Sequence, residues 1–167
     1  DDGGVYTGYM KKIISTTSNT WQNIWVHCWD ATWGGVFTKL ASLFPDREDF
    51  DYFSRLNLEF WTGGAVSHED SSDGNYLEPS PAGYAMINTW GSARYNTAAQ
   101  LCCLVYHKYH PGSEGLVEWA RGQMEYLLGD NPMGYSYLVG YPSPEESVKH
   151  PHHRAAHGSK TNDMNDP

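Results

Sequence analysis

The sequence predicts an all-α fold in which helical hairpins, joined by long polar loops, form a bundle or a toroid. Hydrophobic residues make up 40% of the 167 residues and aromatic residues 14%, which excludes a disordered chain. Apolar residues recur with helical spacing in four segments, and proline and glycine separate these segments. We therefore expect four helices and two long loops.

The first helix is expected over residues 21–44. Tryptophans recur every four residues from Trp21 to Trp33, which places them along one helix face. Apolar residues continue this pattern to Phe44, and Pro45 ends it.

A second helix is expected to follow, with Asp46 as its N-cap. It ends at Gly63, a residue type that favours the left-handed conformation after a helix. Its apolar residues are Phe50, Phe53, Leu56, Phe60 and Trp61. Serine, glycine and proline then predict a loop over residues 65–86.

The second half of the chain predicts a further pair of helices. The first covers residues 92–109 with Ser92 as its N-cap, and the second covers residues 113–128 and ends at Gly129. Residues 129–167 are rich in glycine, proline and histidine and have little helical periodicity. A loop of that length is usually functional or disordered.

Charge and cysteine content narrow the classes of function. Twenty acidic and 11 basic residues give a net charge of −9, so no nucleic-acid partner is expected. Apolar runs are too short to span a membrane. Three cysteines cannot form a disulfide framework, and we expect buried free thiols at Cys28, Cys102 and Cys103.

Polar side chains interrupt the tryptophan row of the first predicted helix. His27 and Asp30 lie among Trp25, Trp29 and Trp33. Core packing is the simplest interpretation, but a buried Asp30 would need a partner. An exposed row would suit a sugar ring, which stacks on an indole while its hydroxyls meet the polar rim. Both interpretations remain open at this point.

A second aromatic segment, Trp90–Tyr95, lies at the start of the third predicted helix. Arg94 falls in the first turn, where its charge opposes the helix dipole, so a specific role is plausible. The alternative is a solvated arginine whose stem lies along an apolar surface.

A histidine-rich run near the end of the chain contains His150, His152, His153, Arg154 and His157. An H-x-H spacing on an extended loop can bind zinc, although the arginine disfavours a cation. Alternatively, histidine and arginine offer donors to hydroxyl oxygens or to a carboxylate. Glycosidic-bond hydrolysis needs two carboxylic groups, and the acidic residues of this chain form no convincing pair.

Several of these segments together resemble glycoside hydrolase family 9, the cellulase family with an (α/α)6 barrel. The similarity is carried by QMEYLLGDNPMG at 123–134, SYLVGY at 136–141 and PHHR at 151–154. The Trp25–Asp30 and Trp90–Tyr95 segments also match family segments in the right order. This resemblance implies part of an (α/α)6 barrel with long loops, and inverting hydrolysis of β-1,4-glucan.

The resemblance also implies roles for individual residues near the cleavage point. His152 and Arg154 match the family's active-site histidine and arginine, which hold the sugar. Trp90 and Tyr95 match aromatic residues that line the cleft, with Arg94 beside them.

Two further positions match through the first aromatic segment. Trp25 corresponds to another stacking platform, and Asp30 to a position linked to a structural calcium. Calcium takes six to eight oxygen ligands, so Asp30 alone does not make a site.

The chain departs from the family in what it lacks. The D-A-G-D motif that supplies the base and the N-E motif that supplies the acid do not occur in it. We therefore expect residues 1–167 to be a single partial domain, with an active-site loop region at 129–167, that supplies cleft residues but not the acid and base. The expected partners are β-glucan and an attached carbohydrate-binding domain, and the expected location is extracellular. The alternative is a non-catalytic carbohydrate-binding module.

Overall fold

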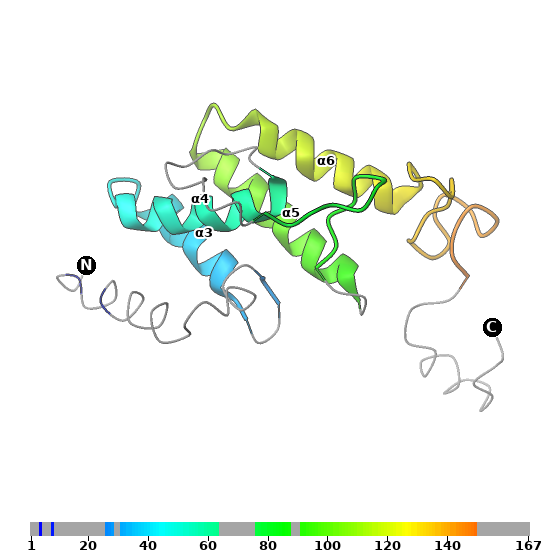
Figure 1. Ribbon diagram of the computed structural model, residues 1–167, viewed down its shortest axis with the longest axis horizontal. Coiled ribbons are helices and arrows are strands. Elements are labelled where there is room, and N and C mark those ends of the chain that lie inside the picture. The colour runs from blue at the N-terminus through cyan, green and yellow to red at the C-terminus, as the bar shows by residue number, and fades with distance from the viewer. Residues whose placement is uncertain are drawn as a thin grey trace.

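The computed structural model describes residues 4, 8, 26–28, 31–63, 76–87 and 91–149 of the chain. This part of the chain contains four helices, and the predicted all-α class is confirmed (Figure 1). In chain order they are α3 (Trp33–Leu43), α4 (Glu48–Thr62), α5 (Ser92–Tyr109) and α6 (Glu114–Leu128). Within the described ranges, no helix is long and apolar enough to cross a bilayer.

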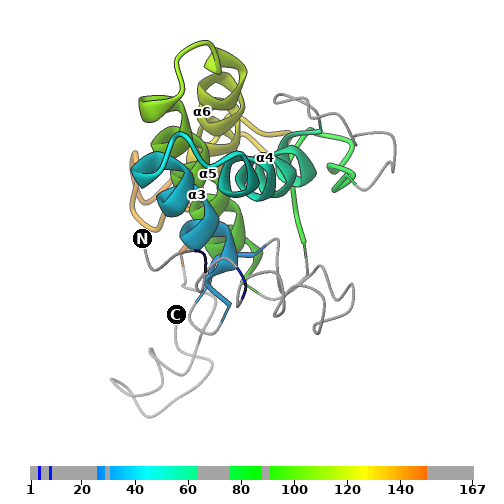
Figure 2. The ribbon, with the colours of Figure 1, turned by 90° about the vertical axis from the view of Figure 1, so that its left-hand side faces the viewer.

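The four helices form two hairpins that pack against each other. A turn at 44–47 joins α3 to α4, and a turn at 110–113 joins α5 to α6. Helix α5 also contacts both α3 and α4, so the hairpins lie side by side (Figure 2). Both short turns lie at one end of the molecule, which we call the turn end.

The opposite end, which we call the loop end, collects the longer connections. Helices α3 and α5 begin there, and α4 and α6 end there. Segments 76–87 and 129–149 also lie at this end, toward the right in Figure 1. Neither segment contains a helix, which agrees with the predicted loops. Because successive helices alternate in direction, residues that are far apart in the sequence lie together at the loop end.

Buried apolar side chains join the hairpins. Phe37 of α3 is fully buried and stacks on Phe53 of α4, with 5.3 Å between ring centroids. Leu58 of α4 packs in a second cluster with Cys103 of α5 and Leu116 of α6. Each such side chain contributes about 1.5–3 kcal/mol on burial, so these contacts hold the helices in register.

Two glycines end helices as the sequence predicts. Gly63 has a φ of 63°, and its N–H donates to the Glu59 carbonyl. Gly129, with a φ of 123°, follows α6. The predicted N-caps at Asp46 and Ser92 are wrong, since Arg47 and Gly91 occupy those positions. Asp46 belongs to the preceding turn, and left-handed Gly91 lets Ser92 adopt the first helical conformation.

The predicted first helix begins much later than expected. Residues 26–28 and 31–32 are not helical, and α3 starts only at Trp33. The Cys28 N–H donates to the Ala31 carbonyl over 2.8 Å, which is opposite in direction to a helical hydrogen bond, where an N–H donates to a carbonyl four residues before it. Spacing by four therefore does not place Trp33 on one helix with the preceding tryptophans, which lie outside the described residues.

None of the three cysteines forms a disulfide bond, as predicted. Cys102 and Cys103 are buried in α5, which confirms the prediction for these two. Cys28 is half-buried and not buried as expected, because it lies before α3 and not within a helix.

Candidate functional site

Arg94 and Tyr95 lie in the first turn of α5, at the loop end. The Arg94 guanidinium lies over the Tyr95 ring, 4.5 Å from its centroid, and donates a hydrogen bond to the Tyr95 hydroxyl. Arg94 is exposed, whereas Tyr95 is half-buried against the hydrophobic core. The tyrosine thus holds an exposed cation in one place.

This pair has the chemistry of a sugar-binding group. The guanidinium carries several N–H donors that suit hydroxyl oxygens, and the aromatic face suits a sugar C–H face. The pair contains neither a carboxyl group nor an imidazole, the side-chain groups that most often act as general acids and bases. It can bind and orient a ligand.

A buried pair of amides anchors the segment before α5. Asn96 of α5 is 0% exposed and Gln123 of α6 is 6% exposed. Gln123 Oε1 accepts from the Ala85 N–H (2.9 Å) and from Asn96 Nδ2 (2.8 Å). Gln123 Nε2 donates to the Gly83 carbonyl, and Asn96 Nδ2 donates to the Ala85 carbonyl, each over 2.9 Å. We call this set the amide clamp.

Three stacked tyrosines continue from the clamp to the surface. The rings of Tyr84 and Tyr126 are 4.7 Å apart, and those of Tyr126 and Tyr137 are 6.3 Å apart. Burial raises the pKa of Tyr84 to about 12. The stack ties segment 76–87, the end of α6 and segment 129–149 into one unit.

Segment 129–149 is held by its own polar side chains. Asn131 Nδ2 donates to the carbonyls of Tyr126 (2.7 Å) and Tyr135 (2.8 Å). Ser136 pairs with Ser147 in an isolated bridge, and its N–H donates to the Glu146 carbonyl over 2.9 Å. The segment therefore has a defined path along the loop end.

The structure places only part of the predicted site. Arg94 and Tyr95 lie together, as described above. The other predicted residues lie outside the described residues: Trp25, Asp30, Trp90, His152 and Arg154. The zinc hypothesis for residues 150–157 falls outside them as well. Sequence reasoning missed Asn96 and Gln123, although polar residues on the buried faces of two amphipathic helices could have indicated them.

Glu59 is the one buried acidic residue in the described ranges. Glu59 is almost fully buried in α4 and accepts a hydrogen bond from the Tyr76 hydroxyl over 3.1 Å. Across the described ranges, no group of three histidine, cysteine or acidic residues could hold a metal ion. Asp30 lies outside the described residues, so the calcium expected there stays a prediction.

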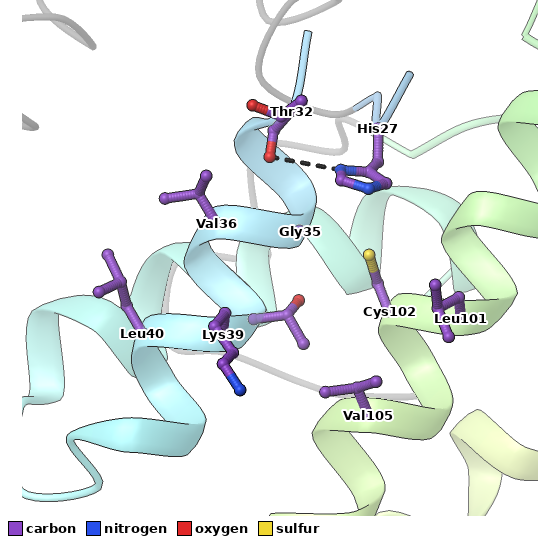
Figure 3. Close-up of a pocket in the computed structure, with 10 residues that line it drawn as sticks. His27, Thr32, Gly35, Val36, Lys39, Leu40, Leu101, Cys102 and Val105 are labelled. Carbon is purple, nitrogen blue, oxygen red and sulfur yellow. Dashed lines mark hydrogen bonds between the residues drawn. The ribbon is translucent and has the colours of Figure 1, made fainter. Parts of the chain in front are cut away.

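A cavity of about 410 Å³ lies between α3 and α5 (Figure 3). Its walls are mostly apolar and include Val36, Leu40, Leu101 and Val105. Its polar lining residues are Lys39, one histidine and two threonines, and the lining contains no carboxylate. Because these walls are mostly apolar, they suit packing against apolar side chains better than sugar binding.

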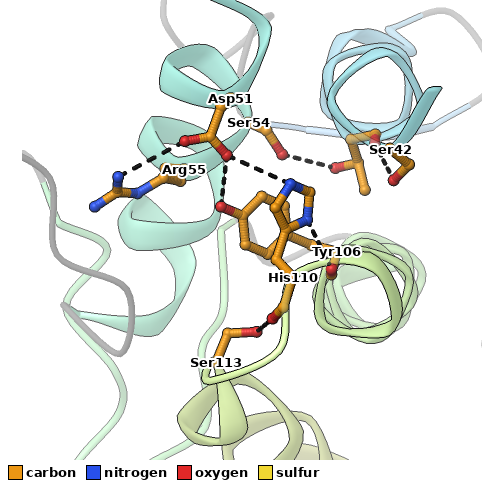
Figure 4. A network of polar contacts seen from close by, with 8 residues as sticks. Ser42, Asp51, Ser54, Arg55, Tyr106, His110 and Ser113 are labelled. Atoms are coloured by element: carbon orange, nitrogen blue, oxygen red, sulfur yellow. Dashed lines mark hydrogen bonds and ion pairs between the residues drawn. The ribbon is translucent and has the colours of Figure 1, made fainter. Parts of the chain in front are cut away.

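A polar network lies at the turn end and joins the two hairpins (Figure 4). The Tyr106 hydroxyl donates to Asp51 Oδ1 over 2.6 Å, and His110 Nε2 lies 3.7 Å from the same oxygen. Burial, with a further contribution from Asp51, raises the pKa of Tyr106 well above its usual value. Its position at the turn end separates this network from Arg94 and Tyr95.

Comparisons of its sequence match this chain to a known family. The chain matches the family model of glycosyl hydrolase family 9 over residues 4–167. It is 32% identical over 165 residues to Endoglucanase A of Bacillus pumilus, covering 97% of this chain and 24% of that protein. It is 36% identical over 203 residues to an endoglucanase of Dictyostelium discoideum, covering 99% of this chain and 27% of that protein. The chain thus spans about a quarter of the length of these relatives.

Solved structures agree with the sequence matches. The cellulase Cel9M of C. cellulolyticum superposes with a TM-score of 0.71 at 29% identity, covering 98% of this chain and 34% of that one. Endoglucanase CelQ from Clostridium thermocellum complexed with cellotriose gives 0.69 at 30% identity, covering 91% and 26%. The all-helical fold is part of the (α/α)6 barrel of such cellulases. The chain therefore belongs to glycosyl hydrolase family 9.

Proposed function

We propose that this chain is part of a catalytic domain that hydrolyses β-1,4-glucan with inversion, and that it supplies one wall of the substrate cleft. The observation that carries the proposal is the Arg94–Tyr95 pair at the loop end. Family membership and the relatives named endoglucanases support the reaction class. The relative solved with cellotriose supports an oligosaccharide ligand.

In this proposal the chain binds and orients substrate. The Tyr95 ring and hydroxyl hold the exposed Arg94 guanidinium in place, and the Arg94 N–H groups donate to the hydroxyls of a sugar. The resemblance adds Trp25, Trp90 and the His152/Arg154 pair as further contacts along the cleft. Holding the glycosidic bond in place lowers the barrier, because small misplacements of reacting atoms are costly.

Proton transfer is assigned to other parts of the protein. Inverting hydrolysis uses one carboxylic acid and one carboxylate about 6.5–9.5 Å apart, with room for a water molecule. Neither of the family's motifs for these groups occurs in this chain. We therefore place the acid and base outside it, and we extend the proposal to secretion, because a polymeric glucan lies outside the cell.

The proposal is tested by removing the Arg94 guanidinium in the whole protein. Arg94→Ala should lower kcat/KM for sugar release from soluble cellulose by about tenfold or more, because a charged hydrogen bond contributes about 1.5–3 kcal/mol. Arg121→Ala is the matched control, since Arg121 is an exposed arginine on α6. It should leave the rate unchanged.

Two outcomes would contradict the proposal. Equal rates of sugar release for Arg94→Ala and the parent protein would show that Arg94 does not bind substrate. Calorimetry that shows binding of cello-oligosaccharides by a parent protein that releases no sugar would favour the non-catalytic carbohydrate-binding module.

A further inference from the structure

We propose that Gln123 is a positioning residue for the substrate-binding end of α5. Through the amide clamp it anchors the Gly83–Ala85 segment to α5 and α6, and so fixes Ala85, which belongs to the hydrophobic cluster against which Tyr95 packs. This assignment rests on the proposed function of the loop end. Gln123 lies on α6 and acts through the chain before α5.

The hydrogen bonds of Gln123 reach two separate parts of the fold. Its Oε1 accepts from the Ala85 N–H and from Asn96 of α5, and its Nε2 donates to the Gly83 carbonyl. The three distances lie between 2.8 and 2.9 Å. An apolar side chain in this buried position would leave the amide and carbonyl groups of the segment without these partners, which is costly.

The anchored segment lies close to the proposed cleft along the chain. Ala85 is fixed on both its N–H and its carbonyl, by Gln123 and Asn96. Gly91, with a φ of 56°, forms the N-cap of α5. Ala85 also belongs to the hydrophobic cluster against which Tyr95 of α5 packs. Losing the Gln123 anchor gives Ala85 more conformational freedom, which weakens the support of the Arg94–Tyr95 pair.

A neighbouring glutamine, Gln100, offers a control that distinguishes a positioning role from an effect on overall stability. Gln100 of α5 is 4% exposed, and its Nε2 donates to Asn96 Oδ1 over 2.7 Å. It belongs to the same buried polar group, but its hydrogen bond goes to Asn96 and not to the 83–85 segment. Removing its amide should therefore destabilise the helices while the anchor on Ala85 remains.

The experiment compares Gln123→Met with Gln100→Met in the whole protein. Methionine keeps a similar shape and removes the hydrogen bonds. Gln123→Met should raise KM for a cello-oligosaccharide about tenfold while kcat changes less, and should speed exchange of the Ala85 amide hydrogen about tenfold. Gln100→Met should lower the melting temperature by a similar amount and leave both KM and the exchange at Ala85 unchanged.

A second variant serves if Gln123→Met fails to fold. Gln123→Glu keeps an oxygen acceptor for Ala85 and Asn96 but loses the donor to Gly83, so its KM should lie between those of the parent and the methionine variant. Equal rises in KM for the two methionine variants would overturn the assignment. Faster exchange at Ala85 with unchanged KM would overturn it as well. A parent protein that releases no sugar would overturn the proposed function, while exchange at Ala85 would still report on the anchor.

Discussion

Tyr84 shows how burial changes the acid–base chemistry of a single side chain. It lies in segment 76–87, stacked on Tyr126, and is 7% exposed. Burial disfavours the phenolate, which raises the pKa of Tyr84 from 10 to about 12. In the unfolded chain this hydroxyl ionises near its ordinary value, so folding and ionisation oppose each other at high pH.

Stability should therefore fall at alkaline pH, and Tyr84 should account for part of that fall. Its contribution is fully present below pH 10 and is lost as the pH rises through about 12, the folded-state pKa. Tyr84→Phe should reduce the loss of unfolding free energy between pH 9 and 12, by about 1–3 kcal/mol. Urea unfolding of the whole protein at a series of pH values measures this difference. Parallel curves for the parent and the variant would contradict it.

At the residue scale, the sequence correctly predicts burial where the side-chain type alone decides it. Cys102 and Cys103 are buried because a thiol behaves as a small apolar group, and burial raises the pKa of Cys102 to about 11. Asn96 and Gln123 were missed because their partners are backbone groups of a distant segment. No local pattern encodes that pairing.

At the scale of helices, the pattern of apolar residues predicts α4, α5 and α6 well, and α3 poorly. Glycine and proline mark the ends of the three well-predicted helices, and tertiary contacts agree with their periodicity. In the first segment the tryptophan spacing predicts a single helix, whereas residues 26–28 and 31–32 are not helical and α3 begins only at Trp33. The periodicity of apolar residues reflects only their spacing in the sequence, so it does not predict which backbone groups form hydrogen bonds.

Two glycines should respond in opposite directions to the same substitution. Gly63 after α4 has a left-handed φ of 63°, so Gly63→Ala should cost about 1–2 kcal/mol of stability. Gly122 lies inside α6 with open space around it, so Gly122→Ala should add about 0.5–1 kcal/mol. Thermal unfolding of the two variants checks the signs. A stabilising Gly63→Ala would show that the left-handed cap is absent from the folded protein.

At the scale of the whole molecule, this chain is an open part of a larger ring. It spans about a quarter of the length of its curated relatives, and an apolar cavity lies open between α3 and α5. The family's motifs for the catalytic acid and base do not occur in these residues, so the sequence predicts neither group here. The family resemblance predicted the fold because its motifs are long, whereas the site needs side chains from several segments.

Leu101 should prove buried in the complete protein. Leu101 on the cavity wall and Leu43 at the end of α3 are each 56% exposed in this chain. If other helices of the barrel cover the cavity, Leu101→Ser should lower the unfolding free energy of the whole protein by about 1–3 kcal/mol. Leu43→Ser should stay within about 0.5 kcal/mol. Denaturant unfolding of both variants gives the comparison, and equal effects would argue against a covered cavity.

The division of the fold into a turn end and a loop end has a practical consequence. The connections at 44–47 and 110–113 are short and lie away from Arg94 and Tyr95. A tether to a solid support, or a fused partner, placed at exposed Pro111 or Gly112 would leave the opposite face free. Immobilised in that orientation, the molecule would present its Arg94 side outward to an insoluble fibre.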